Sequence, residues 1–236
     1  MTKILKKVCI IIPAYNEGSV IRSVVRDVLK SLSNAAVQYE VVVVNDGSKD
    51  NTSQEASKGG AKVIDHILNS GAGGATATGL SYASQNNFDF AATMDADGQH
   101  LAQDVINGLR EAERSNVDLL IGSRLIDTDG MSKVKILGNK GLSGVTGMLF
   151  GVYVTDSQSG LRVFSKKALE SLRWKTSGYE FCSEMLWRAK QLHLDISEYP
   201  IKAIYTDYSK AKGQNNWNAI NIIKSLVKRR IVEMFE

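Results

Sequence analysis

Short apolar runs alternate with longer segments of helical periodicity through the first half of this 236-residue chain. The apolar runs cover residues 8–12, 40–44, 61–64, 90–94 and 118–121, and each is predicted to be a buried strand. The segments between them, residues 19–32, 52–58, 75–86 and 103–115, have the spacing of helices. This alternation predicts an α/β fold, with a mostly parallel sheet and helices on both of its faces.

The second half of the chain is less regular. Residues 133–150 are apolar and basic with several glycines, 163–165 fit a strand, 166–172 and 181–192 fit helices, 196–206 are extended, and 218–235 fit a terminal helix. No linker rich in Pro, Gly or Ser separates these segments. We therefore expect one domain over residues 1–215, and a C-terminal amphipathic helix over 216–236 that joins this domain or contacts a membrane or a second copy.

Composition argues against several classes of protein. The formal net charge of +4 is too small to indicate a nucleic-acid partner. The two cysteines, Cys9 and Cys182, lie in apolar surroundings and lack the spacing of a zinc site. No apolar stretch approaches the roughly 18 residues of a membrane-spanning helix, and the N-terminal apolar run is too short for a signal peptide. These features predict a cytoplasmic protein that can touch a membrane from that side.

Polar and glycine-rich segments follow the predicted strands. They are residues 13–17, 45–48, 69–79, 95–100 and 122–124, in the order of the five strands. Ligands of parallel α/β sheets bind beyond the carboxyl ends of the strands, where these segments meet. A sheet with a purely structural role has no need of such a collection, so the sequence predicts a binding site at this edge.

Asp95 and Asp97 directly follow a buried strand, which places them rigidly. Two carboxylates at this spacing can converge on one hard cation, and Mg²⁺ or Mn²⁺ in such a site commonly shares its coordination with substrate phosphates. The alternative is an acidic turn, because Asp and Gly favour turns. The glycine-rich residues 69–79 lack the Lys-Ser/Thr of a P-loop and are predicted to form a tight entry into the following helix.

The segments after the first two strands carry groups suited to a nucleoside. The Asp46 carboxylate can accept a hydrogen bond from a base N–H. Tyr15 can pack against a base, and Glu17 can bond to ribose or base, whereas Pro13 ends the pairing of the first strand. The alternative for residues 13–17 is a plain strand-to-helix turn, and Asp50 or Thr52 is expected to cap the next helix.

Five motifs in order and spacing resemble the family 2 glycosyltransferases with the GT-A fold. They are PAYNE at 13–17, NDGS at 45–48, DADGQH at 95–100, GSR at 122–124, and TDSQSGLR at 155–162, which resembles a segment of the dolichyl-phosphate mannose synthase-like branch. The resemblance covers roughly residues 8 to 212 and implies an inverting hexosyltransferase. Its donor would be a nucleotide-sugar linked to GDP or UDP, and its acceptor a polyprenyl phosphate.

The resemblance also implies a role for each matching residue. Pro13, Tyr15, Glu17 and Asp46 would hold the nucleoside, and Asp95, Ala96 and Asp97 the ribose, diphosphate and divalent metal, with Gln99 near the metal. Arg124 would contact phosphate near the transferred sugar. Arg162, together with Lys210 and Lys212, would close over the phosphates, and Lys140, Ser143, Arg124 and Arg162 would bind the acceptor. Asp95, Asp97, Arg124 and Arg162 are the predicted catalytic residues.

The nature of the acceptor depends on whether the chain supplies a general base. A sugar hydroxyl needs one because it is protonated at neutral pH, whereas a phosphate already carries an anionic oxygen. Glu184 is the best candidate for a base, and its alternative is a carboxylate on a helix surface. The lack of a clearer base motif favours a phosphate acceptor.

Alternatives stay open at this stage. One is a glycosyltransferase that acts on a glycan hydroxyl, and another is a non-catalytic nucleotide-binding scaffold. The terminal helix has apolar residues at helical spacing with Lys224, Lys228, Arg229 and Arg230 beside them, which fits an anionic membrane surface or docking on the core. The donor base, the donor sugar and the oligomeric state are not determined by the sequence.

Overall fold

The computed structural model describes residues 6–33, 38–204 and 217–233. Its centre is a seven-stranded sheet in the order β3-β2-β1-β4-β6-β5-β7. The strands are β1 (Lys7–Ala14), β2 (Gln38–Asn45), β3 (Lys62–Asp65), β4 (Phe90–Thr93), β5 (Leu119–Ser123), β6 (Arg162–Ser165) and β7 (Ile196–Pro200). Only β6 runs antiparallel to its neighbours within this sheet, so the prediction of a mostly parallel α/β sheet is confirmed.

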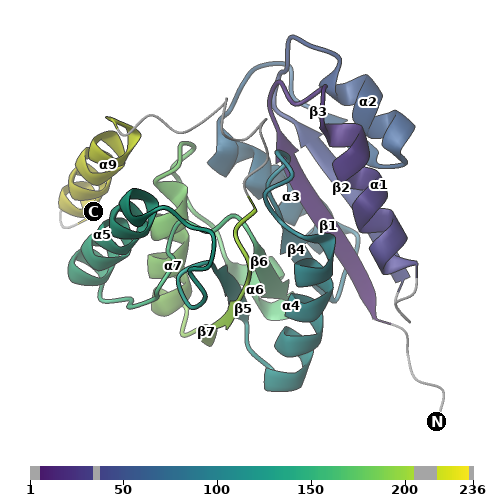
Figure 1. Cartoon of the computed structure of the whole chain (residues 1–236). Coiled ribbons are helices and arrows are strands. Elements are labelled where there is room, and N and C mark those ends of the chain that lie inside the picture. The colour runs from purple at the N-terminus through teal and green to yellow at the C-terminus, as the bar shows by residue number, and fades with distance from the viewer. Residues whose placement is uncertain (1–5, 34–37, 205–216, 234–236) are drawn as a thin grey trace.

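Helices cover both faces of the sheet, as Figure 1 shows. The helices are α1 (Ile21–Leu32), α2 (Thr52–Gly59), α3 (Ala72–Gln85), α4 (Ala102–Ser115), α5 (Lys133–Phe150), α6 (Lys166–Ser171), α7 (Phe181–Gln191) and α9 (Trp217–Glu233). One apolar cluster joins α1, α2 and α4 to one face, and a second joins α3, α6 and α7 to the other. Both faces of the central strands are thereby removed from water, which is why these strands are almost wholly apolar.

The strand β1 continues through Pro13, although the sequence suggested that pairing ends there. Pro13 and Ala14 pair with Val44 and Asn45 of β2. Ile11, two residues earlier, accepts a hydrogen bond from the Met94 amide on the β4 side. Pro13 faces that same side, where β4 has already ended at Thr93, so its missing N–H breaks no ladder bond.

Residues 133–150, which the sequence left without a secondary structure, form the 18-residue helix α5. Its N-cap Ser132 accepts a hydrogen bond from the Lys135 amide, and Gly151 ends it in a left-handed conformation. Four glycines lower the intrinsic helix propensity of this segment, so tertiary packing of Leu142, Thr146 and Phe150 has to stabilise the helix.

The terminal helix α9 docks on the body of the protein through its described residues. Leu226 is buried in a cluster with Phe150 of α5 and Trp187 of α7, and Ile222 packs against the same cluster. In Figure 1, α9 lies beside α5 at the side of the molecule remote from β3. Of the two predicted uses of the helix, docking on the core is therefore seen. The predicted boundary between residues 215 and 216 lies in the undescribed segment 205–216.

Candidate functional site

The carboxyl-terminal edge of the sheet gathers the predicted residues from four strands. Asp46 follows β2, Asp95 and Asp97 follow β4, and Arg124 follows β5. Because β6 is antiparallel, its first residue, Arg162, lies at the same edge and pairs with Thr93 and Ile121. The topology thus collects three carboxylates and two guanidinium groups at one edge, as the strand-end rule predicts.

The loops after β1 and β2 are bound to each other. The Asn16 amide donates to Ser48 Oγ at 2.9 Å, and the Lys49 amide donates to Asn16 Oδ1 at 2.9 Å. Asn16 has a φ of 55°, a left-handed conformation that Asn tolerates better than most residues. Tyr15 projects from this pair of loops with 41% of its surface exposed, whereas Glu17 is buried. Tyr15 is therefore placed to pack on a base.

The predicted helix cap at Asp50 or Thr52 is replaced by contacts to the first loop. Asn51 occupies the N-cap of α2 and makes no capping hydrogen bond through its side chain. Asp50 instead accepts the Gly18 amide at 3.0 Å, and Thr52 Oγ1 accepts the Glu17 amide at 2.8 Å. Both side chains thus fix the loop that carries Tyr15.

Asp46 is nearly enclosed, with 3% of its surface exposed. Its carboxylate accepts hydrogen bonds from the amides of Ser70 and Gly71, each at 2.8 Å, from Ser70 Oγ at 2.7 Å, and from His66 Nδ1 at 2.8 Å. Burial opposes ionisation, but these hydrogen bonds outweigh it and lower the pKa of Asp46 below its ordinary value. The carboxylate is therefore a fixed anion that also shapes the loop before α3.

Asp95 is held by a buried histidine. His100 Nε2 donates to Asp95 Oδ2 at 2.9 Å; the His100 side chain is 1% exposed, and the Asp95 side chain is 49% exposed. Desolvation by the surrounding protein opposes ionisation of Asp95. The hydrogen bond from His100 and the charges of His100, Arg124 and Arg162 outweigh it and lower the pKa of this carboxyl. His100 thus orients a carboxylate that solvent or a ligand can reach.

Asp97 and Gln99 lie on the same turn. The Gln99 amide N–H donates to Asp97 Oδ1 at 3.0 Å, and the side-chain amide of Gln99 donates to Asp97 Oδ2. Burial and the neighbouring Asp95 charge raise the pKa of Asp97. A divalent cation would relieve this repulsion, so the two carboxylates fit Mg²⁺ or Mn²⁺. Within the described residues no group of three or more His, Cys, Asp or Glu could hold a metal, so substrate oxygens and water would have to complete the coordination.

Gly160 lies directly against Asp95. A Cβ built on Gly160 would overlap the Asp95 carboxylate. The Gly160 carbonyl also accepts a hydrogen bond from Thr93 Oγ1 at 2.8 Å, which holds the two segments together. The glycine of the 155–162 motif is therefore required by the close approach of the backbone to the acidic pair.

Arg124 forms a two-point ion pair with Asp156. Its Nε and Nη2 donate to the two Asp156 oxygens at 2.7 and 2.9 Å, and Asp156 is fully buried. Glu198 of β7 accepts the amides of Thr155 and Asp156 and so holds the 155–156 segment in place. This chain of contacts fixes the guanidinium at the sheet edge, where its charge acts on Asp95. Glu198 is a supporting residue that the sequence motifs did not indicate.

Arg162 lies below the site rather than on its surface. It is 1% exposed, and its Nη2 donates to the Ser157 carbonyl at 2.8 Å while Nη1 contacts the Met185 sulfur at 3.0 Å. Its guanidinium also stacks over the Phe181 ring, and its Nε is buried without a hydrogen bond. In this conformation its charge reaches Asp95, but its enclosure blocks the predicted direct contact with phosphate or acceptor.

The predicted acceptor residues Lys140 and Ser143 share a pocket of about 300 Å³. The lining is completed by Leu125, Gly144, Tyr153, Val154 and Thr155. Leu125 and Thr155 adjoin Arg124 and Asp156 in the chain, so the pocket opens beside the ion pair. Ser143 Oγ accepts the Ser157 amide at 2.9 Å, which ties α5 to the same segment. The two residues are therefore brought together, as predicted.

Lys135, in the first turn of α5, is a further basic residue near the acidic turn. Burial and the Arg124 charge lower its pKa, and the Asp97 charge acts in the opposite direction. The sequence did not single out Lys135, because its position next to Arg124 depends on where α5 crosses the sheet edge. Lys210 and Lys212, predicted to close over the phosphates, lie outside the described residues.

Glu184 is neither an exposed carboxylate nor a group at this edge. It is fully buried in α7 and accepts the amides of Lys175 and Thr176 at 3.1 and 2.8 Å. Arg188 Nε lies 3.6 Å from it. These contacts hold the segment before α7 in place, and the surface-carboxylate interpretation is thereby corrected.

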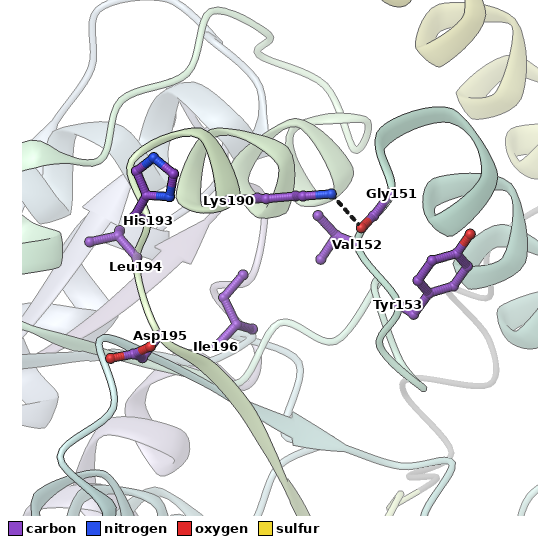
Figure 2. Close-up of a pocket in the computed structure, with 8 residues that line it drawn as sticks. All are labelled: Gly151, Val152, Tyr153, Lys190, His193, Leu194, Asp195 and Ile196. Carbon is purple, nitrogen blue, oxygen red and sulfur yellow. Dashed lines mark hydrogen bonds between the residues drawn. The ribbon is translucent and has the colours of Figure 1, made fainter.

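A second cavity, of about 430 Å³, lies between the end of α5, the end of α7 and the start of β7. In Figure 2, Lys190 extends to the Gly151 carbonyl, with Val152 and Ile196 in the centre. Ile196 pairs with Leu119 at the start of β5, so this cavity lies at the opposite edge of the sheet from Asp95. Volume alone therefore does not mark the site.

Comparisons with known proteins agree with this arrangement. The model of glycosyl transferase family 2 matches residues 9–173. A UDP-N-acetylglucosamine–dolichyl-phosphate N-acetylglucosaminyltransferase of Methanococcus voltae is 42% identical over 233 residues, covering 89% of this chain and 90% of the relative. An undecaprenyl-phosphate mannosyltransferase of Micrococcus luteus is 30% identical over 219 residues, covering 87% of each chain.

The fold is also found in a solved structure. Glucosyl-3-phosphoglycerate synthase from Mycobacterium tuberculosis, in complex with Mn²⁺, UDP-glucose and phosphoglyceric acid, superposes with a TM-score of 0.68. The identity is 21%, and the match covers 94% of this chain and 79% of the synthase. No helix in the described part of the chain is long and apolar enough to cross a bilayer. The family match and the sheet with its acidic edge establish that this chain is a GT-A-fold glycosyltransferase of glycosyl transferase family 2.

Proposed function

We propose that this protein transfers a hexose, with inversion, from a GDP- or UDP-linked donor to a polyprenyl phosphate at a membrane surface. The observation that carries the proposal is the position of the Lys140 and Ser143 pocket beside Arg124, with the acidic pair Asp95 and Asp97 at the same sheet edge. The relatives named for transfer to dolichyl and undecaprenyl phosphate support the class of acceptor.

The donor half of the reaction uses the loops after β1, β2 and β4. Tyr15 packs on the base, Asp46 accepts its N–H, and Asp95 and Asp97 meet the ribose and diphosphate. A divalent cation bound by the two carboxylates supplies charge that stabilises the diphosphate as it leaves. Arg124 adds a fixed positive charge that needs no rearrangement, because Asp156 already holds it in place.

The acceptor half needs no proton removal. None of the described residues that line the pocket of Lys140 and Ser143 is a carboxylate, and Glu184 is bound to backbone amides elsewhere. A phosphate oxygen is already anionic at neutral pH and can attack the anomeric carbon directly. A hydroxyl acceptor would lack a base at this pocket, so the site favours phosphate.

The outer face of α5 suits the lipid part of such an acceptor. Val134, Leu137 and Met148 are 68%, 76% and 81% exposed and lie on one side of the helix with Gly141 and Gly144. No described atom lies within 4 Å of a Cβ built on either glycine. An exposed apolar strip of this kind marks an interaction surface. The membrane contact is therefore proposed for α5, whereas Leu226 of α9 is buried against the core.

A transfer assay tests the proposal. The full-length chain with Mn²⁺ is given UDP- and GDP-sugars and either a polyprenyl phosphate in detergent or a panel of soluble glycans. Transfer to the polyprenyl phosphate alone, with inverted anomeric configuration, is expected. Transfer to a glycan alone would move the protein to the hydroxyl-acceptor class. Nucleotide binding that is unchanged in Asp97→Ala, with no turnover on any donor, would instead indicate a scaffold.

A further inference from the structure

The Asp46 carboxylate has acceptor capacity for one more hydrogen bond. Its Oδ1 already receives the Ser70 amide, Ser70 Oγ and His66 Nδ1, at 2.7 to 2.8 Å. Its Oδ2 receives only the Gly71 amide, at 2.8 Å. Each carboxylate oxygen offers about two lone-pair sites, so Oδ1 is full and Oδ2 keeps one.

His66 is fixed in a way that keeps Oδ1 full. A carboxylate only accepts, so the proton of the neutral ring sits on Nδ1 and points to Asp46. Nε2 then accepts the Thr78 hydroxyl of α3 at 2.9 Å. The ring cannot turn away from Asp46 without losing both hydrogen bonds, and its own amide is bound to the Asn45 carbonyl at 2.9 Å.

The two bases that the proposed function leaves open differ in what they ask of a carboxylate. Uracil presents a single N–H, at N3, between two carbonyl oxygens. Guanine presents two adjacent N–H groups, at N1 and N2, which a carboxylate receives with both of its oxygens. With Oδ1 full, one of the guanine donors would be left unpaired in the site, and an unpaired buried donor weakens binding.

We propose that the donor is a uridine diphosphate sugar, and that His66 sets this preference by occupying Oδ1 of Asp46. The inference rests on the proposed contact between Asp46 and the base. His66 acts through Asp46 and is therefore a positioning residue. A site that accepts one N–H rejects the base with two because the second donor finds no acceptor.

Calorimetric titration of the full-length chain with UDP and with GDP, in Mn²⁺, tests the preference. UDP is expected to bind at least about ten-fold more tightly than GDP, which corresponds to roughly 1.4 kcal/mol. Equal or tighter binding of GDP would overturn the uridine assignment while leaving a nucleotide-sugar transferase intact. Binding of neither nucleotide would count against the proposed function itself.

Two variants of His66 test its role. The amide nitrogen of His66→Asn can replace Nδ1 and donate to Asp46, whereas the amide of His66→Gln extends toward the position of Nε2. We expect His66→Asn to keep the UDP-to-GDP ratio within about two-fold of the original. In His66→Gln the ratio should fall about ten-fold, and KM for the UDP-sugar should rise more than kcat falls.

Melting temperatures without nucleotide show whether either variant is unfolded, and the ratio of the two affinities is insensitive to a folded fraction that both nucleotides share. If His66→Gln discriminates as well as His66→Asn while both are folded, His66 does not set the preference. The uridine assignment would then rest on the unmodified chain alone.

Discussion

The two sides of the candidate site are built differently. On the donor side, Asp46 is 3% exposed, and its carboxylate is bound by two backbone amides, a hydroxyl and a ring nitrogen. On the acceptor side, Leu137 and Met148 of α5 are 76% and 81% exposed over a strip with two open glycines. One side is a closed hydrogen-bond network, and the other is an uncovered apolar surface.

The difference matches the partners that we propose. A nucleotide is small and polar, and a network formed before binding loses little further entropy when the nucleotide arrives. A polyprenyl chain is long and apolar, so it needs accessible surface rather than fixed donors. Substitutions on the donor side should therefore change turnover or nucleotide affinity, whereas substitutions on α5 should change the use of the lipid acceptor.

The largest effect is expected at Gly160. A methyl group in Gly160→Ala would overlap the Asp95 carboxylate and push it from its position. Displacement of a catalytic group by about 1 Å can cost about 100-fold in rate, so kcat should fall by at least about that factor. Steady-state transfer rates measure the effect. The matched control is Gly141→Ala, where the added methyl meets open space, and its rate should stay within about two-fold.

A smaller effect is expected at His100, which holds Asp95 through Nε2. The amide of His100→Gln can reach the position of Nε2, whereas the shorter His100→Asn cannot. The rate should fall about ten-fold in His100→Asn and less in His100→Gln, since loss of a partner that orients a metal ligand typically costs about 10- to 100-fold. Equal rates in both variants, at equal Mn²⁺ saturation, would show that the hydrogen bond to Asp95 does not matter.

The outer face of α5 tests the other side of the comparison. Replacing Leu137 and Met148 together with Glu puts two charges on the exposed strip. Binding to vesicles of anionic phospholipid and transfer to polyprenyl phosphate should fall several-fold, because apolar area buried in the membrane is lost. Calorimetric affinity for UDP should not change. A loss of UDP affinity in the folded variant would show that the two sides are not separate.

The smallest effect is expected in the framework beneath the site. Asp118 accepts Lys167 Nζ at 2.7 Å and Ser165 Oγ at 2.9 Å, and burial is outweighed by these bonds, so its pKa is lowered. A lowered pKa stabilises the fold above the unfolded value of about 4, and this stability disappears as pH falls through the folded pKa. Asp118→Asn should cost about 1–2 kcal/mol at pH 7 and much less near pH 3. Urea unfolding at the two pH values measures the difference.

Most of the framework followed from the sequence, because local patterns suffice for it. The runs at residues 8–12 and 40–44 are continuous apolar segments, which only a strand covered on both faces can bury. The collection of Asp46, Asp95 and Arg124 at one edge followed from their positions directly after strands. The helix α5 did not follow, because its glycines obscure the period and its buried face is defined by contacts with α7 and α9.

The sequence by itself determined the sheet, its loaded edge and the family, since these depend on the period of apolar residues and on motifs a few residues long. Only the tertiary structure decided what each polar group faces. It enclosed Arg162, bound Glu184 to the amides of Lys175 and Thr176, and brought His66 onto Asp46, 20 residues away. Contacts of this kind depend on distances between side chains on different elements, and no local pattern encodes those distances.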